Sequence, residues 1–209
     1  MFVNRHDGNL PMSDPMIESK NAVRSERTTL ALLRTARELF ARRGYAGTST
    51  PDIVREAGVS RGALYHHFAD KMDLFRAVVD REQAAVAIAI EAASSDMSDP
   101  VAAILSGGDA FLDAMRDPGR RRILLIDGPA VLGDAAMRDI DRQHGARTLV
   151  EGIQAAVDSG HLRPLPVGAL ADLLSAAFDR AALADDPGGE YREAIRGLLE
   201  GLVTDDRPV

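Results

Sequence analysis

The chain has 209 residues, 45% of them hydrophobic and 27% charged, which is the composition of a globular protein with one domain or two small ones. It contains no cysteine, which excludes a disulfide framework and a cysteine-based metal site. No apolar run reaches transmembrane length, and the first residues lack the apolar core of a signal peptide, so we expect a cytoplasmic protein.

The net charge of −7 is unevenly distributed along the sequence. Residues 24–80 hold ten Arg and Lys against seven Asp and Glu, a net charge of +3, whereas residues 81–209 hold 13 against 22, a net charge of −9. A basic region followed by an acidic one predicts that a nucleic-acid partner would contact the first part of the chain.

Residues 1–24 are polar, contain Gly8, Pro11 and Pro15, and show no periodicity, which predicts a disordered tail. A first helix is predicted from about Glu26 to Arg43, where Gly44 ends it. Its buried stripe has the i, i+4, i+7, i+8 spacing of one helical face and comprises Leu32, Ala36, Leu39 and Phe40.

The segment from Thr50 to Phe68 predicts two short helices joined by a tight turn. Thr50 is a suitable N-cap before a proline, and Gly58 stands where the first helix must end with a positive φ. Ser60 would cap a second helix that begins at Arg61. Leu64 and Phe68, spaced i, i+4, would face the first helix, as in a helix-turn-helix.

The outward face of the second helix predicts contact with DNA. Arg61 can donate two hydrogen bonds to guanine, and Gly62 lets the backbone approach closely. Tyr65 and the histidines can donate to phosphates. The full set of predicted DNA-binding residues is Arg27, Thr48, Thr50, Ser60, Arg61, Gly62, Leu64, Tyr65, His66, His67 and Lys71. An ordinary corner between two helices is one alternative, and a module that binds only protein is another.

The segment from about Arg27 to Val79 resembles the DNA-binding domain of the TetR family of transcriptional regulators. Val54 departs from the family pattern, which often has alanine there. The residues that carry the resemblance are Ala36, Leu39, Phe40, Gly44, Tyr45, Thr48, Thr50, Asp52, Ile53, Glu56, Ala57, Gly58, Val59, Ser60, Gly62, Leu64, Tyr65, His67, Phe68, Lys71, Leu74 and Phe75.

The remaining sequence predicts further helices. A long helix capped by Asp70 should run to about Ala93 and carry changes in the following region to the DNA-binding domain. The other predicted helices are 100–115, 120–126, one long helix over 132–159, 166–183 and 190–203. Gly107 and Gly108 lie inside the predicted helix 100–115, and we expect a bend there rather than a close approach to the bare backbone.

The last two helices have apolar faces wide enough to contact a partner. The resemblance implies that two helices from each subunit form a four-helix dimer interface, whereas the alternative is a monomeric core. We favour the homodimer, because a single recognition helix reads few bases. The interface residues predicted from these helices are Leu170, Leu174, Phe178, Ile195, Leu198 and Leu202.

No nucleotide-binding, zinc-protease or serine-hydrolase motif is present, so we expect neither an enzyme nor a bound metal or other cofactor. Asp139, Asp141 and His144 lie close together on a predicted helix, and we interpret them as a solvated face with one inward histidine. Arg120, Arg121 and Arg122 follow a turn and are predicted to lie on the surface.

The resemblance also implies a ligand cavity in the C-terminal domain, with an effector that releases the DNA. Phe111, Met115, Leu124 and His144 are the predicted lining residues, chosen as inward apolar or isolated polar groups. The predicted fold is all-α, with a helix-turn-helix domain over 25–79 and a helical-bundle ligand-binding and dimerisation domain over 80–204. The predicted function is a homodimeric repressor that a small-molecule effector releases from a palindromic operator. A helical enzyme or ligand carrier with a vestigial head, and a non-specific DNA-compacting protein, remain alternatives.

Overall fold

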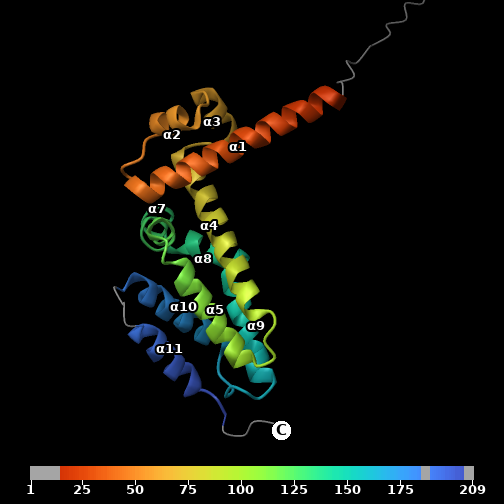
Figure 1. Ribbon diagram of the computed structural model, residues 1–209, viewed down its shortest axis with the longest axis vertical. Helices are drawn as coiled ribbons and strands as arrows, with labels where there is room; N and C mark the ends of the chain where they lie inside the picture. The colour runs from red at the N-terminus through yellow and green to blue at the C-terminus, as the bar shows by residue number, and fades with distance from the viewer. Residues whose placement is uncertain (1–14, 185–188, 205–209) are drawn as a thin grey trace, which may run out of the picture.

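The computed structural model describes residues 15–184 and 189–204, and within them the chain is almost entirely helical (Figure 1). Helices α1 (Pro15–Arg43), α2 (Thr50–Ala57) and α3 (Arg61–His67) lie at one end of the molecule. We call these helices, with the first turns of α4 (Lys71–Ser94), the head. The prediction of an all-α fold with an N-terminal helix-turn-helix is confirmed.

The body contains the other helices, arranged along the second half of α4 (Figure 1). They are α5 (Pro100–Ala114), α6 (Pro118–Arg121), the π-helix η1 (Arg122–Asp127), α7 (Gly128–Leu132), α8 (Asp134–Gln143), α9 (Gly145–Asp158), α10 (Val167–Leu183) and α11 (Glu190–Glu200). Helix α4 packs against α1 in the head and against α5 and α9 in the body. It runs without a break through the predicted domain boundary at residues 79 and 80.

Two helices differ from their predicted extents. Helix α1 begins at Pro15 rather than near Glu26, so residues 15–24 are helical where a disordered tail was expected. Pro15 suits the first turn of a helix, and neither proline nor glycine follows it before Arg43. The rest of the predicted tail, residues 1–14, lies outside the described residues.

The predicted single helix over 132–159 is wrong, because the chain bends sharply at His144 (φ −122°, ψ −98°) between α8 and α9. The ring Nε2 of His144 lies 2.8 Å from Asp80 Oδ1 on α4, and glycine follows at position 145. This long-range contact fixes the bend, and no local sequence pattern encodes it.

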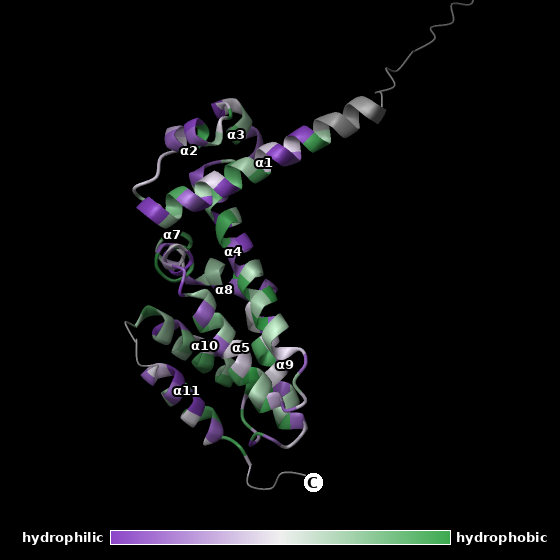
Figure 2. Cartoon of the chain, in the orientation of Figure 1, coloured by the Kyte–Doolittle hydropathy of each residue, from purple (hydrophilic) through white to green (hydrophobic). Residues whose placement is uncertain are grey.

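The core continues from the head into the body, and Figure 2 shows the hydrophobic residues concentrated on the helices of the interior. Leu39, Phe40 and Phe75 in the head and Ile123 and Ile153 in the body are completely buried. In the parts of the chain that the structure describes, no helix is long and apolar enough to span a membrane.

Candidate nucleic-acid interface and ligand cavity

The helix-turn-helix is fixed by three local interactions. The Ser49 hydroxyl caps α2 by accepting the N–H of Asp52 at 3.3 Å, so the predicted cap at Thr50 is displaced by one residue. Gly58 adopts φ 67° and donates its N–H to the last carbonyls of α2, as predicted. Ser60 caps α3 by accepting the N–H of Ala63 at 3.1 Å. The turn therefore sets the start of α3 at Arg61.

The inner face of α3 packs into the head. Leu64 is completely buried and Phe68 is 7% exposed, as expected from their i, i+4 spacing. A side chain without exposed surface cannot contact a base, so the inclusion of Leu64 among the DNA-binding residues is wrong. Its role is to hold α3 against α1 and α2.

The outer face of α3 carries Arg61, Gly62, Tyr65 and His66, all of them exposed. The Arg61 guanidinium lies 5.4 Å from the centre of the Tyr65 ring, which orients it on the helix surface. A Cβ added at Gly62 would meet only the Ser60 hydroxyl, at 3.9 Å, so this end of α3 is open to a close approach. The arrangement presents an arginine and a bare backbone at the N-terminal end of an exposed helix, which is the end that recognition helices direct at bases.

Two other predicted DNA contacts are turned inward. His67 is half-buried, and its Nδ1 lies 3.2 Å from the Thr29 hydroxyl on α1. The Thr48 side chain is buried, with its hydroxyl donating to the Gly44 carbonyl at 2.8 Å. The predicted contact of the Thr48 side chain with phosphate is therefore wrong, because its hydroxyl is used inside the head. The contact of His67 uses only Nδ1, so donation from its Nε2 to a phosphate stays a prediction.

Lys71 has a structural role in the head that was not predicted. Its Nζ donates to the carbonyls of Tyr45 and Thr48, both at 3.0 Å, and lies 3.9 Å from the centre of the Tyr45 ring. Burial lowers the pKa of this ammonium. Two of its three donors hold the loop before α2 against the start of α4, so Lys71 orders the head, and its contact with a phosphate through the third donor stays a prediction.

The remaining predicted contacts lie at the edges of this surface. Thr50 is half-buried at the first residue of α2, and Ser60 is exposed at the cap of α3. Arg27 is exposed on α1, where it lines an open groove of about 670 Å³ together with Arg34 and Arg81. This groove adds positive charge beside the head.

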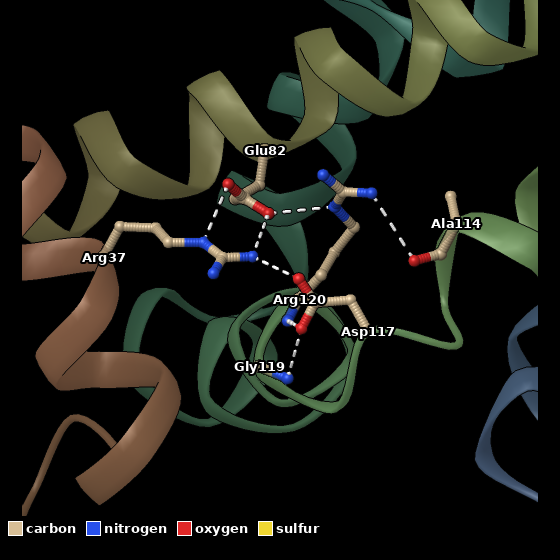
Figure 3. A network of polar contacts seen from close by, with 6 residues as sticks. All are labelled: Arg37, Glu82, Ala114, Asp117, Gly119 and Arg120. Atoms are coloured by element: carbon tan, nitrogen blue, oxygen red, sulfur yellow. Dashed lines mark hydrogen bonds and ion pairs between the residues drawn. The ribbon is translucent and has the colours of Figure 1, made fainter.

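A network of charged side chains joins the head to the body (Figure 3). Glu82 of α4 is only 9% exposed and accepts from Arg37 of α1 at 3.2 Å and from Arg120 of α6 at 2.9 Å. Arg37 also donates to Asp117 at 2.5 Å. Burial opposes the ionisation of Asp117, but hydrogen bonds from Arg37 and the backbone N–H groups of Arg120 and Gly119 hold its pKa below the usual value.

The neighbouring arginines extend this joint. Arg122 donates to the Arg42 carbonyl at 3.4 Å, and Arg121 donates to the Ala182 carbonyl at 3.4 Å. The Tyr45 N–H donates to Asp127 at 2.9 Å. Arg120 and Arg121 are half-buried and held by distant residues, so the prediction that they lie on the surface is wrong, whereas the Arg122 side chain is 41% exposed.

Two adjoining cavities, of about 280 and 290 Å³ and partly open to solvent, lie in the body. Gln83, Phe111, Asp141 and Ser175 line both of them. The first is lined by Gly107 and Gly108, and a Cβ at Gly108 would overlap the ring of Phe178. Helix α5 continues through both glycines without a break, and the close approach to the backbone, which was not the favoured alternative, occurs at Gly108.

The predicted cavity residues fall into three groups. Phe111 lines both cavities, whereas Met115 and Leu124 line only the second. His144 lines neither, because its ring faces Asp80 on α4. The prediction of His144 as a lining residue is therefore wrong. In the described parts of the chain, no group of three or more His, Cys, Asp or Glu is placed to hold a metal ion.

Two carboxylates occupy unexpected positions at the cavities. The interpretation of Asp141 as part of a solvated face is wrong, and Asp179 was not predicted. Asp141 of α8 lines both cavities, and Asp179 of α10 lines the second. Burial raises the pKa of Asp141. Burial, followed by the charge of Asp141, raises the pKa of Asp179 to about 7. These residues are 38 positions apart in the sequence, and nothing in the local pattern indicated that they face one another.

The predicted dimer residues are divided between the core and the surface. Leu174, Phe178 and Ile195 are buried within the subunit, so they are not available to a partner in this conformation and their assignment to the interface is wrong. Leu170 and Leu202 are half-buried. Leu198 is 63% exposed, and Leu173, which was not predicted, is 70% exposed.

Comparison with known proteins matches both parts of this architecture. Residues 32–78 match the family model of bacterial regulatory proteins of the tetR family. Residues 101–202 match that of the tetracyclin repressor-like C-terminal domain. Two crystal structures are similar over most of both chains. A TetR-family transcriptional regulator from Pectobacterium atrosepticum is 33% identical, with a TM-score of 0.72, over 88% of this chain and 98% of that one. A putative TetR-family transcription regulator from Shewanella is 27% identical, with a TM-score of 0.71, over 84% of this chain and 97% of that one.

Curated relatives support the same assignment. The TetC protein of transposon Tn10 from Escherichia coli is 24% identical over 84% of this chain and 92% of its own length. The transcriptional regulator AcrR of Shigella flexneri is 30% identical, and that match spans about half of each protein. The chain therefore belongs to the TetR family and is a DNA-binding transcriptional regulator.

Proposed function

We propose that this regulator is a homodimeric repressor that binds a palindromic operator and is released from it by a small molecule bound in the body cavities. The observation that carries the proposal is the connection of an exposed α3 to the two cavities of the body through one continuous helix, α4. Gln83, Val86 and Ile90 of α4 line the first cavity, while the first turns of the same helix belong to the head. The proposal contains no catalytic step and places the protein with the DNA, in the cytoplasm.

In this proposal, Arg61 reads bases and its neighbours position the head. Arg61 is exposed at the N-terminal end of α3, where a bidentate contact with guanine can form. The adjacent phosphates would be contacted by hydroxyl and imidazole groups on α3 and at the starts of α2 and α3. These groups belong to Tyr65, His66, Thr50 and Ser60. Arg27 on α1 supplies a further contact with the backbone of the duplex.

The dimer is proposed to form through the outward faces of α10 and α11. Leu173 and Leu198 are the most exposed leucines of these helices. Gly197 has no heavy atom within 4 Å of an added Cβ, so a partner helix can approach it closely. A twofold dimer would present two copies of α3 about 34 Å apart, one turn of DNA. Replacing Leu173 or Leu198 with Glu should convert the dimer to monomers in sedimentation equilibrium, whereas Leu165→Glu, before α10, should not.

Release by the effector requires that the effector bind one conformation of the body better than another. Movement of α4 at the cavity would be transmitted to the head by the helix itself and by the contacts of Glu82 with Arg37 and Arg120. The two heads of the dimer would then take a spacing that no longer fits the operator.

The direct test is selection of bound sequences from a random duplex pool at near-physiological salt. We expect an enriched palindrome for the wild type. Arg61→Ala should cost about 1–3 kcal/mol of operator binding and relax the preference at one position of each half-site. Arg116→Ala is the matched control, because its side chain is 82% exposed in the body. Binding without any enriched sequence would contradict the proposal and indicate a DNA-compacting role.

A further inference from the structure

The walls of the two cavities carry an excess of negative charge. Asp134, Asp141, Glu151 and Asp179 are the acidic lining residues, whereas Arg138 is the basic one. Glu151 is exposed and paired with Arg147 at 3.3 Å, so the excess comes from the three aspartates. Most of the remaining surface of the cavities is apolar. A binding site of this kind favours an organic cation over a neutral or anionic molecule of the same shape.

Asp141 and Asp179 line the cavities without a hydrogen bond to their carboxylates, although the charge of His144 acts on Asp141. Three other carboxylates of the body are paired. Asp117 and Asp127 accept hydrogen bonds across the joint with the head, and Asp109 forms ion pairs with Arg192 and Arg196. Within residues 15–184 and 189–204, the carboxylates of Asp141 and Asp179 form no hydrogen bond or ion pair. No fully shielded side-chain oxygen or nitrogen in these ranges lacks a partner, so both carboxylates reach open space at the cavities.

The free energy needed to ionise both Asp141 and Asp179 indicates that a positively charged ligand would be favoured between them. Burial first, and then the charge of Asp141, raises the pKa of Asp179 to about 7. The environment therefore disfavours a second negative charge beside the first. A positive charge placed between the two carboxylates would relieve both effects, because it would replace the lost hydration and cancel the repulsion.

Aromatic rings complete the site. Phe111 and Phe178 both line the first cavity, with their ring centres 6.3 Å apart and their planes at 61°. The bare backbone of Gly108 provides the room for Phe178. These rings therefore offer an apolar wall against which the hydrophobic part of a ligand can be buried.

We infer that the adjoining cavities bind an amphipathic organic cation, with its apolar part against Phe111 and Phe178 and its ammonium group directed at Asp141 and Asp179. This inference deepens the proposed function, since it names the class of the effector, but binding itself can be measured without DNA. The site is internal to one subunit, so it needs no residue from a partner.

The test uses the full chain and two probes of the same shape, benzyltrimethylammonium, which is permanently charged, and its neutral analogue neopentylbenzene. Isothermal titration calorimetry should give a dissociation constant at least about tenfold lower for the cation. Asp141→Asn and Asp179→Asn should each weaken binding of the cation by about tenfold or more and leave the neutral probe within about twofold. Unchanged melting temperatures or higher ones would show that both variants are folded.

The matched control is Asp139→Asn, on the same helix as Asp141. Its carboxylate is 59% exposed and paired with Arg142, so binding of the cation should be unchanged. Equal binding of both probes, no binding of the cation at millimolar concentration, or full binding to both cavity variants would each overturn the inference.

The same probes separate this inference from the proposed function. Binding of the cation that depends on Asp141 and Asp179 but leaves operator affinity unchanged would support the cation site and contradict effector release. Release of the operator by the neutral probe, with no preference for the cation, would support effector release and overturn the cation site.

Discussion

The core of the head is closed by aromatic rings, whereas the core of the body contains two cavities. In the head, the ring of Phe75 lies 5.0 Å from those of Phe40 and Tyr45, and Lys71 closes the cluster over Tyr45. In the body, glycines line the cavity walls and two carboxylates form no hydrogen bond among the described residues. The head is built to hold one surface in place, and the body is built with internal volume and charge that a ligand could fill and neutralise.

The joint between these regions belongs to neither type of core. It consists of arginines and carboxylates from α1, α4, α6 and η1, arranged around the nearly buried Glu82 (Figure 3). Charged contacts of this kind depend on geometry, so a small shift of α4 would change several of them together. The comparison predicts that substitutions in the head, the joint and the body will have different consequences.

The largest effect is expected at the joint. Glu82→Gln should destabilise the protein by about 2–4 kcal/mol, because Arg37 and Arg120 would lose the charge that they share. Urea denaturation should then show separate transitions of head and body where the wild type shows one. Glu91→Gln, exposed near the end of the same helix, should have no such effect. A single transition at unchanged urea concentration would show that Glu82 does not couple the two regions.

The next largest effect is expected in the pH dependence of stability, which tests the raised pKa of Asp179 in the body. The pKa of Asp179 is about 7 in the folded protein, against an ordinary value of 3.8. The folded state therefore binds the carboxyl proton of Asp179 more tightly than the unfolded state does. Below about pH 4 this difference stabilises the folded protein, and the stabilisation is lost as the pH rises to 7. Asp179→Asn does not titrate, so its stability relative to the wild type should increase by up to a few kcal/mol between pH 4 and pH 8.

Denaturation at several pH values measures this difference, and Asp139→Asn is again the control. Asp141 and Arg138 on α8 line the same cavity, and burial also raises the pKa of Asp141. A difference between Asp179→Asn and the wild type that is the same at every pH would contradict a raised pKa at Asp179.

A smaller effect is expected in the cavity wall. Gly108→Ala would place a methyl group against the Phe178 ring, and overpacking of this kind costs about 1–3 kcal/mol. The better helix propensity of alanine offsets up to about 1 kcal/mol of that cost. Gly168→Ala, at the second residue of α10, meets no atom within 4 Å, so it should leave the melting temperature unchanged or slightly higher. Equal melting temperatures for the two variants would show that Gly108 is not required for the position of Phe178.

The smallest effect distinguishes two roles of a lysine. Lys71→Ala should destabilise the head by about 1–2 kcal/mol, because two backbone carbonyls lose a charged donor. The salt dependence of operator binding should be unchanged, whereas loss of a phosphate contact lowers its slope by about 1. Arg27→Ala provides the comparison, because this exposed arginine is a proposed phosphate contact and its loss should lower the slope. A shallower slope for Lys71→Ala would support its role as a phosphate contact.

Much of the head could be predicted because its signals are local. Gly58 and Ser60 determine the turn through their own backbone and side chain, and the spacing of Leu64 and Phe68 determines which face is buried. That spacing already contradicted the use of Leu64 as a DNA contact. The inward positions of Thr48 and Lys71 depend on carbonyls in the loop before α2, so residue type alone could not predict them.

The body was predicted less well because its features arise from distant residues. The partners of Arg120 and Arg121 are Glu82 and Ala182, and the bend at His144 is held by Asp80. The pairing of Asp141 with Asp179 requires α8 and α10 to meet at one cavity. Sequence periodicity found most of these helices, but it contains no information about which polar side chains the packing brings together.

The central claim is that the state of the body cavities determines the spacing of the two heads. Because the chain has no cysteine, Ala69→Cys introduces a single site for a spin label on an exposed position of each head. Pulsed electron–electron double resonance then measures the distance between the two spin labels, one on each head of the dimer. We predict one narrow distribution on operator DNA, and a different mean distance when saturating benzyltrimethylammonium is added to the free dimer. The same distribution with and without bound cation would contradict the claim.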